Sequence, residues 1–168
     1  MDWEGIYQDN SSAVFQFLLS MTNNCEDAED LLQETFIRAM RAGSKLRDIG
    51  KVKSWLLAIA RNLFLDNLKK KRVRGTVNYY DNNQEIFECV PDTNPNPAQI
   101  SEQSDFKSRL RKILDGMSET YRTVFTLGVI QRLNYQEIED ITGWSPSMVK
   151  SNIFRARRKV AGELEEGY

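Results

Sequence analysis

The sequence of 168 residues contains no histidine and only two cysteines. Without histidine, the usual zinc sites and acid–base catalysis by an imidazole are excluded. Cys25 and Cys89 are too few for a disulfide framework and too far apart for a CxxC metal site, so each is expected to be a reduced thiol or a small core residue. The chain also has no Gly-rich phosphate loop, nucleophile elbow or paired catalytic carboxylates.

Long apolar runs are missing as well. No stretch approaches the ~20 residues that a helix needs to cross a bilayer, and the N-terminus has neither the positive flank nor the apolar core of a signal peptide. We therefore expect a cytoplasmic protein without membrane insertion. The hydrophobic content of 40% is sufficient for a buried core, in one domain or two small ones.

The charges are strongly partitioned along the chain, although the net charge is only −1. Residues 1–37 hold eight acidic residues and no Lys or Arg, whereas residues 38–74 hold twelve Lys or Arg against two Asp. Residues 75–106 again hold six acidic residues and no base. A nucleic-acid footprint confined to such a basic segment is compatible with an overall pI of 5.7.

Apolar residues recur at helical spacing through most of the chain. One stripe covers residues 14–19, a second helix is expected from about Glu26 to Ala42, and Gly43 ends it. The cleanest stripe consists of Val52, Trp55, Leu56, Ile59, Ala60, Leu63, Phe64 and Leu68. The pattern resumes from Phe106, and together these features predict an all-α protein.

A helix-turn-helix is indicated near the C-terminus by the segment NYQEIEDITGWSPSMVKSNIFRARRKV. Asn134 and Glu137 form a variant of the capping box, Gly143 ends the first helix, and Ser145 with Pro146 begins the second. The second helix has an apolar stripe of Val149, Ile153, Ala156 and Val160. Its opposite side carries Ser147, Lys150, Ser151, Arg155 and Arg158. Such side chains on a packed helix suit the major groove, which favours DNA binding over a merely solvated bundle helix.

Residues 76–104 have the composition of a flexible acidic linker. They contain three of the four prolines and several Asn, and they lose the helical periodicity. We expect them to join two small helical domains, residues 1–75 and 105–168. Fully extended, the linker would reach on the order of 100 Å at ~3.3–3.6 Å per residue, enough to place the domains on DNA sites more than one helical turn apart.

The helix that begins at Val52 also carries residues suited to nucleic acid. Trp55 can stack on a base, Asn62 can contact a base edge, and the cationic run 69–74 can neutralise phosphates. Trp55 lies on the apolar stripe, so a purely structural role is an equal alternative. A solvated helix end would need fewer cations than the six found between Arg61 and Arg74.

The acidic segment at the start of the second helix has two interpretations. Asp27, Asp30 and Glu34 lie near one another on a helix, as a metal site would require. Acidic residues in the first turn of a helix more often form a solvated face that is stabilised by the helix dipole. Because they alternate with Leu31 and Phe36, we favour a docking surface for a helix of another protein.

Three segments together resemble a known family. DAEDLLQETFIRAMRA (27–42), VKSWLLAIARNLFLDNLKKKR (52–72) and the helix-turn-helix resemble the extracytoplasmic-function (ECF, group 4) sigma factors of bacterial RNA polymerase. The resemblance implies sigma region 2 in residues 1–75 and sigma region 4 in residues 105–168. It implies a transcription initiation factor that is not an enzyme, has no cofactor and binds core RNA polymerase and promoter DNA.

The resemblance also implies roles for individual residues. The residues that match the polymerase-docking segment are Asp27, Asp30, Leu31, Gln33, Glu34, Phe36 and Arg41. Those that match the segment meeting the −10 element, with its adjoining lysines, are Trp55, Arg61, Asn62, Asp66, Lys69 and Lys70. Those at the −35 element are Lys150, Ser151, Phe154 and Arg155, with Arg157 and Arg158 on phosphates.

Further family features concern a loop and a regulator. The loop Gly43–Lys53 lies where the family holds a flipped base. The chain departs from the family at Leu57, where Tyr is frequent, and it lacks the usual Phe before Trp55. Family members are commonly inhibited by an anti-sigma factor, often membrane-bound, so such a partner is expected here.

Two other functions are compatible with parts of the sequence. A repressor or activator would use the same helix-turn-helix and bind symmetric half-sites as a dimer. A metal-dependent nuclease would use the acidic residues 26–34 and would cleave DNA only with a divalent ion.

Overall fold

The computed structural model describes the backbone of residues 1–75 and 97–167, and its side chains except at 97–101. Every regular element in these ranges is helical, which confirms the all-α prediction. The elements are α1 (Trp3–Thr22), α2 (Cys25–Ala42), η1 (Gly43–Lys45), η2 (Ile49–Lys51), α3 (Val52–Val73), α5 (Pro97–Asp115), α6 (Glu119–Phe125), η3 (Thr126–Ile130), α7 (Tyr135–Thr142) and α8 (Pro146–Glu165).

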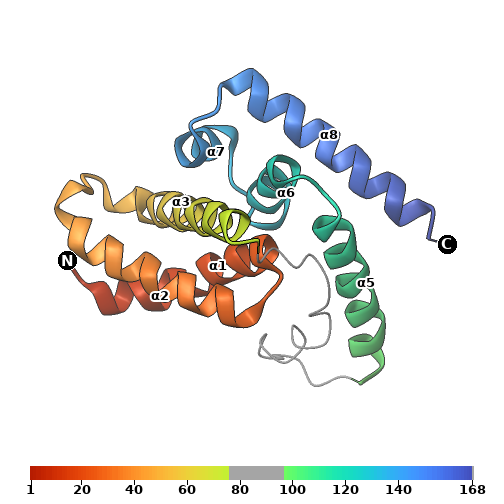
Figure 1. Ribbon diagram of the computed structural model, residues 1–168, viewed down its shortest axis with the longest axis horizontal. Helices are drawn as coiled ribbons and strands as arrows, with labels where there is room; N and C mark the ends of the chain where they lie inside the picture. Colours follow the sequence, from red (N-terminus) through yellow and green to blue (C-terminus); the bar gives the residue numbers. More distant parts are fainter. Residues whose placement is uncertain (76–96, 168) are drawn as a thin grey trace.

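The first three long helices pack against one another (Figure 1). Their contacts bury the apolar stripes that the sequence predicts, and Leu57 is fully buried as well. The apolar residues of this part with 0% exposure are Val14, Phe17, Leu18, Ala28, Ala39, Leu56, Leu57 and Ala60. The expected loop after Gly43 contains two short 3-10 turns, η1 and η2.

The helix-turn-helix forms as predicted, with each of its local signals in place. The Asn134 side chain accepts from the Glu137 N–H at 2.9 Å and the Glu137 carboxylate accepts from the Asn134 N–H at 2.8 Å, which completes the capping box. Gly143 ends α7 with φ 73°, in the left-handed region that favours glycine. Ser145 caps α8, and Pro146 is at its first position.

A π-helical turn, η3, connects α6 to the helix-turn-helix. Gly128 lies in this turn, and a Cβ there would come within 3.3 Å of Ile153 Cδ1 and 3.4 Å of Ile138 Cδ1. The absence of a side chain thus lets η3 approach both helices of the motif closely.

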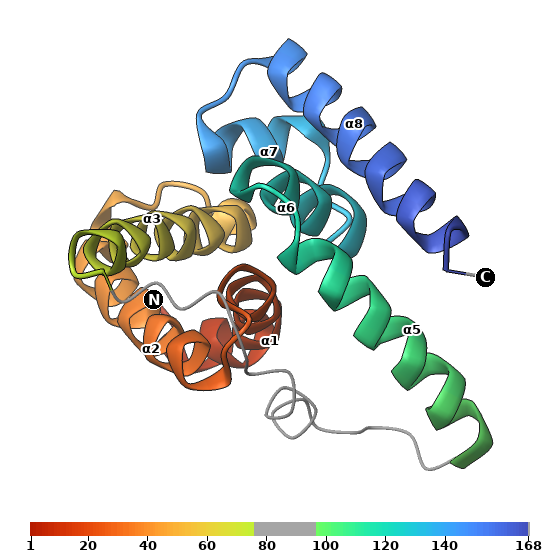
Figure 2. The ribbon, with the colours of Figure 1, turned by 45° about the vertical axis from the view of Figure 1, so that its right-hand side comes forward.

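The two helical parts are packed against each other rather than held apart. Helix α7 contacts α3, while α5, α6 and η3 contact α1. Both views show α7 beside α3, with α8 on the outer side of the molecule, away from α1, α2 and α3 (Figures 1 and 2). This packing brings residues far apart in sequence into one interface.

Two expectations require correction. Helix α5 begins at Pro97, so residues 97–104 are helical, although the sequence predicts no helical periodicity there; residues 76–96 lie outside the described residues. Pro97 is at the helix start, where a missing N–H is tolerated. Cys25 is disulfide-bonded, so the expected reduced thiol is wrong for this residue; the other cysteine, Cys89, lies outside the described residues.

In the part of the chain that the structure describes, every helix is too short or too polar to cross a bilayer.

Candidate nucleic-acid interface

The outer face of α8 presents the residues that the sequence assigns to DNA. Burial of the apolar stripe, from Val149 at 0% exposure to Val160 at 5%, turns the opposite side of the helix to solvent. The exposed residues on this face and its flanks are Lys150, Ser151, Phe154, Arg155, Arg157 and Arg158. All six predicted −35 residues are therefore exposed on one helix, in a form that fits a major groove.

Aromatic rings lie among the cations of this face. The Arg158 guanidinium lies 5.7 Å from the ring centroid of Phe154, and the Lys150 ammonium lies 5.9 Å from that of Tyr135. Phe154 is 62% exposed, which is unusual for a phenylalanine that has only a packing role. An exposed apolar ring beside cations suits contact with a thymine methyl group next to a phosphate.

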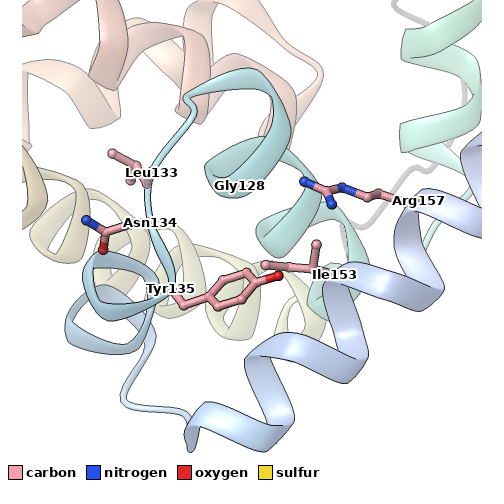
Figure 3. Close-up of a pocket in the computed structure, with 6 residues that line it drawn as sticks. All are labelled: Gly128, Leu133, Asn134, Tyr135, Ile153 and Arg157. Carbon is pink, nitrogen blue, oxygen red and sulfur yellow. The ribbon is translucent and has the colours of Figure 1, made fainter.

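A small cavity lies behind this face, between η3, the start of α7 and α8. Its volume is about 280 Å³, and its lining residues are Gly128, Leu133, Asn134, Tyr135, Ile153 and Arg157 (Figure 3). Small-molecule sites usually have volumes of about 300–1,000 Å³ and several convergent polar groups. The cavity lies just below that range, and we assign no ligand to it.

The predicted −10 residues of α3 differ in their exposure to solvent. Asn62, Asp66, Lys69 and Lys70 are exposed, whereas Trp55 is partly buried against the core. Packing of Trp55 fits its alternative role as a core residue, with part of its surface still accessible.

The cationic end of α3 is joined to α2. The Lys71 ammonium forms an ion pair with the Asp27 carboxylate. This contact removes Lys71 from the free cationic run and leaves Lys69 and Lys70 as its exposed lysines.

The predicted docking residues of α2 lie in two layers. Asp30, Gln33 and Arg41 are exposed. Leu31 and Phe36 are only 7% and 5% exposed, so they belong to the hydrophobic core of the protein. The remaining acids of this set, Asp27 and Glu34, form ion pairs with Lys71 and Arg38.

One local contact on α2 is an exposed ion pair. Arg38 Nε donates to Glu34 Oε1 at 3.0 Å, one helical turn away. An exposed pair of this kind contributes little to stability, so Glu34 can exchange Arg38 for another cation at small cost.

An aromatic contact joins α1 to α2. Tyr7 of α1, which is 47% exposed, packs edge-on against Phe36 with a centroid distance of 4.8 Å.

Arg61 occupies an unexpected place, between the two helical parts. It is 7% exposed, its Nη2 lies 3.4 Å from Glu119 Oε1, and its guanidinium lies 5.0 Å from the ring centroid of Trp144. Sequence reasoning missed Glu119 and Trp144, because no local periodicity indicates a contact between residues this far apart. The burial of Arg61 was missed for the same reason.

Metal binding finds no support in the described part of the chain. No group of three or more acidic, thiol or imidazole side chains there is placed to hold a metal ion.

Burial affects the charge of one arginine on α5. Desolvation lowers the pKa of the Arg111 guanidinium from its ordinary value.

Comparison with known protein families identifies both helical parts. Residues 6–74 match the family model for sigma-70 region 2, and residues 107–160 match the model for sigma-70 region 4. The ECF RNA polymerase sigma factor SigM of Bacillus subtilis (strain 168) is 35% identical over 99% of this chain and 98% of its own length. SigW of the same organism is 29% identical over 96% of this chain and 86% of its own.

Solved structures share the fold. The sigma factor RpoE in complex with the anti-sigma factor NepR from Bartonella quintana matches with a TM-score of 0.77 and 22% identity, covering 98% of this chain and 97% of that one. CnrH in complex with the cytosolic domain of CnrY matches with a TM-score of 0.68 and 20% identity, covering 99% and 89%.

Proposed function

This chain belongs to the ECF sigma factors of the sigma-70 family, and from that membership we propose how its surfaces direct transcription. The chain binds core RNA polymerase and directs it to promoters. The observation that carries this function is the match of both helical parts, in order, to sigma regions 2 and 4. It acts as an initiation factor without catalytic chemistry of its own, in the cytoplasm.

We assign a separate role to each of the two helical parts. Residues 1–75 form region 2, which docks on polymerase and meets the −10 element. Residues 105–168 include the helix-turn-helix of region 4, which reads the −35 element, and α5 extends this part back to Pro97.

Polymerase docking is assigned to the exposed side of α2. Asp30, Gln33 and Arg41 offer charge and hydrogen bonds to a partner helix, and Leu31 with Phe36 fixes their position from the core. Asp27 and Glu34 are already paired with Lys71 and Arg38, so docking there requires exchange of ion-pair partners.

Contacts to the −10 element are assigned to α3 and the turns before it. Asn62 and Asp66 are exposed beside Lys69 and Lys70, which combines hydrogen-bonding groups with phosphate neutralisation. Trp55 and the segment Gly43–Lys53 are proposed to hold an extruded base. Extrusion costs a few kcal/mol, which stacking of about 1–3 kcal/mol per base offsets.

The −35 element is assigned to α8. Lys150, Ser151, Phe154 and Arg155 are proposed to contact base edges, and Arg157 with Arg158 to hold phosphates. The shared exposed face supports this arrangement. Arg155 is well suited to a guanine, since its two parallel donors match guanine O6 and N7.

An anti-sigma factor is the proposed regulator. Two solved relatives of similar fold are a sigma factor bound to the anti-sigma factor NepR and CnrH bound to the cytosolic domain of CnrY. An inhibitor of this chain would cover the polymerase-binding surface of α2.

Gel filtration with purified core polymerase tests the proposal against an ordinary repressor. We expect the chain to co-elute with core polymerase and to bind promoter duplex weakly without it. A repressor would show the reverse: tight binding of a symmetric duplex and no association with polymerase. Cleavage of DNA by the chain alone with Mg²⁺ or Mn²⁺ would instead support a nuclease.

Lys69 and Lys70 give a quantitative test of the −10 assignment. Changing both to Gln is expected to lower the slope of log affinity against log salt, measured for the promoter complex, by about 1–2, because each phosphate contact contributes about 0.9. Lys107 and Lys112 on α5 are also exposed, and changing both to Gln is the matched control, with no change of slope expected. An unaltered slope for the α3 variant would place its lysines away from DNA.

A further inference from the structure

An exposed contact joins the two helices of the helix-turn-helix. The Tyr135 ring comes from the first position of α7, and the Lys150 ammonium of α8 lies 5.9 Å from its centroid. Tyr135 is 43% exposed and Lys150 is exposed as well, so both are accessible to DNA that approaches α8. Lys150 belongs to the proposed −35 face, whereas the proposed function gives no role to Tyr135.

The position of the Tyr135 ring is fixed from its base and from one side. Its backbone directly follows Asn134, which is held by the reciprocal hydrogen bonds of the capping box with Glu137. Its side chain lines the cavity behind the −35 face together with Gly128 and Ile153, and Figure 3 shows the ring directed toward Ile153. Only two rotatable bonds place the ring of a tyrosine, so this ring is a rigid support beside α8.

Lys150 needs support if it is to read a base. It is the fifth residue of α8, and the N-terminal part of a recognition helix is the part that approaches base edges. A lysine ammonium is a point charge on a flexible four-carbon stem, and its contacts to phosphates carry no sequence information. A cation within about 6 Å of an aromatic centroid is attracted to the ring. The Tyr135 ring therefore limits the positions that the Lys150 ammonium occupies.

The origin of the ring in α7 distinguishes this contact from a second one on the same face. The Arg158 guanidinium lies 5.7 Å from the Phe154 centroid, and both residues belong to α8, so their contact is independent of α7. The contact between α7 and α8, by contrast, exists only while the two helices keep their present angle. That angle is maintained by buried residues, among them Ile138 on α7 and Val149 on α8, both 0% exposed.

We propose that Tyr135 is a positioning residue for −35 recognition: its ring restrains the Lys150 ammonium so that it reaches a base edge. This role rests on the proposed contact of α8 with the −35 element. Lysine donates to guanine O6 and N7 in the major groove, and the preference at one base pair then depends on a residue of the other helix. Without the ring, Lys150 is free to bind a phosphate instead, so the preference at this base pair falls more than the overall affinity. A cation–aromatic contact at an exposed site corresponds to a roughly two- to fivefold effect.

Competition between promoters that differ at single −35 positions tests this role, with the full chain in complex with core polymerase. The variants are Tyr135→Leu, Tyr135→Phe, Lys150→Ala and Tyr135→Leu combined with Lys150→Ala, and Phe106→Leu at an exposed position of α5 is the matched control. Lys150→Ala identifies the base pair that Lys150 reads. At that base pair we expect Tyr135→Leu to lower the preference roughly two- to fivefold, and Tyr135→Phe, which keeps an aromatic ring, to retain it. In the Lys150→Ala background Tyr135→Leu should cause no further loss, and the control should behave like the wild type.

Several results would overturn the positioning role. An unchanged preference in Tyr135→Leu, or a uniform loss at every promoter, would show that the ring does not act on base reading. An equal loss of preference in Tyr135→Phe would assign the effect to the hydroxyl group, and a further loss in the Lys150→Ala background would assign it to another residue. If Lys150→Ala itself changes no preference, the proposed −35 contact of Lys150 fails and the positioning role with it. A changed preference in Lys150→Ala with an inert Tyr135→Leu removes the positioning role alone.

Discussion

Ile138→Ala is expected to lower the free energy of unfolding by about 2–5 kcal/mol, the usual cost of truncating a fully buried isoleucine. Ile138 is 0% exposed on α7, and its Cδ1 would lie 3.4 Å from a Cβ built at Gly128 of η3. Surrounding backbone in helices relaxes little, so the cavity remains. Against a typical total stability of about 5–15 kcal/mol, the loss is large, and chemical denaturation followed by circular dichroism measures it.

Ile49→Ala is the matched control for this prediction. Ile49 is 61% exposed, between α2 and α3, and the same truncation there should change stability by no more than about 0.5 kcal/mol. Equal losses for the two variants would contradict the packing of α7 against η3 described above.

Arg155→Ala is expected to weaken promoter recognition by about 1–3 kcal/mol, or roughly 5–150-fold. Arg155 is exposed on the outer face of α8, and its proposed partner is a base of the −35 element. Loss of two parallel hydrogen bonds should relax preference at one base pair. Competition between promoters that differ at single −35 positions measures the effect.

Arg157→Ala separates base reading from general attraction to DNA. Arg157 is also exposed on α8, and its proposed partner is a phosphate, so its loss should weaken all promoters to a similar degree. An unchanged −35 preference in Arg155→Ala would remove that residue from base reading. A changed preference in Arg157→Ala would assign it a base contact instead.

Local signals in the sequence predicted the helix-turn-helix closely. Caps, the glycine end at Gly143 and the Ser145–Pro146 start act within one or two helical turns, so composition and spacing are sufficient to locate them. The apolar stripe of α8 is buried as predicted, from Val149 to Val160. Exposure of the proposed −35 residues follows directly from burial of that stripe.

Contacts between distant segments were beyond sequence reasoning. Arg61 lies off the apolar stripe of α3 and was expected at the surface, yet Glu119 and Trp144 cover it. Periodicity reports which side of a helix is apolar, but it does not report which polar residue a second domain will enclose. The disulfide state of Cys25 was also beyond sequence reasoning, because a count of two cysteines does not show whether either one is oxidised.

The start of α5 was missed for a different reason. Asn, Pro and acidic residues before Phe106 resemble a linker, and the apolar stripe is weak there. Pro97 nevertheless begins the helix, and proline at a first helical position is a recognised start signal. Composition and the proline start signal thus give opposite indications for this segment, and the structure agrees with the start signal.

Run-off transcription with bacterial core polymerase tests the central claim most directly. Templates are genomic fragments that include the region upstream of the chain's own coding sequence, assayed with and without the purified chain. The promoter-directing function predicts defined transcripts only when the chain is present, with start sites that share −10 and −35 sequences at constant spacing. An identical set of transcripts with and without the chain, from polymerase shown to be active with another sigma factor, would contradict it.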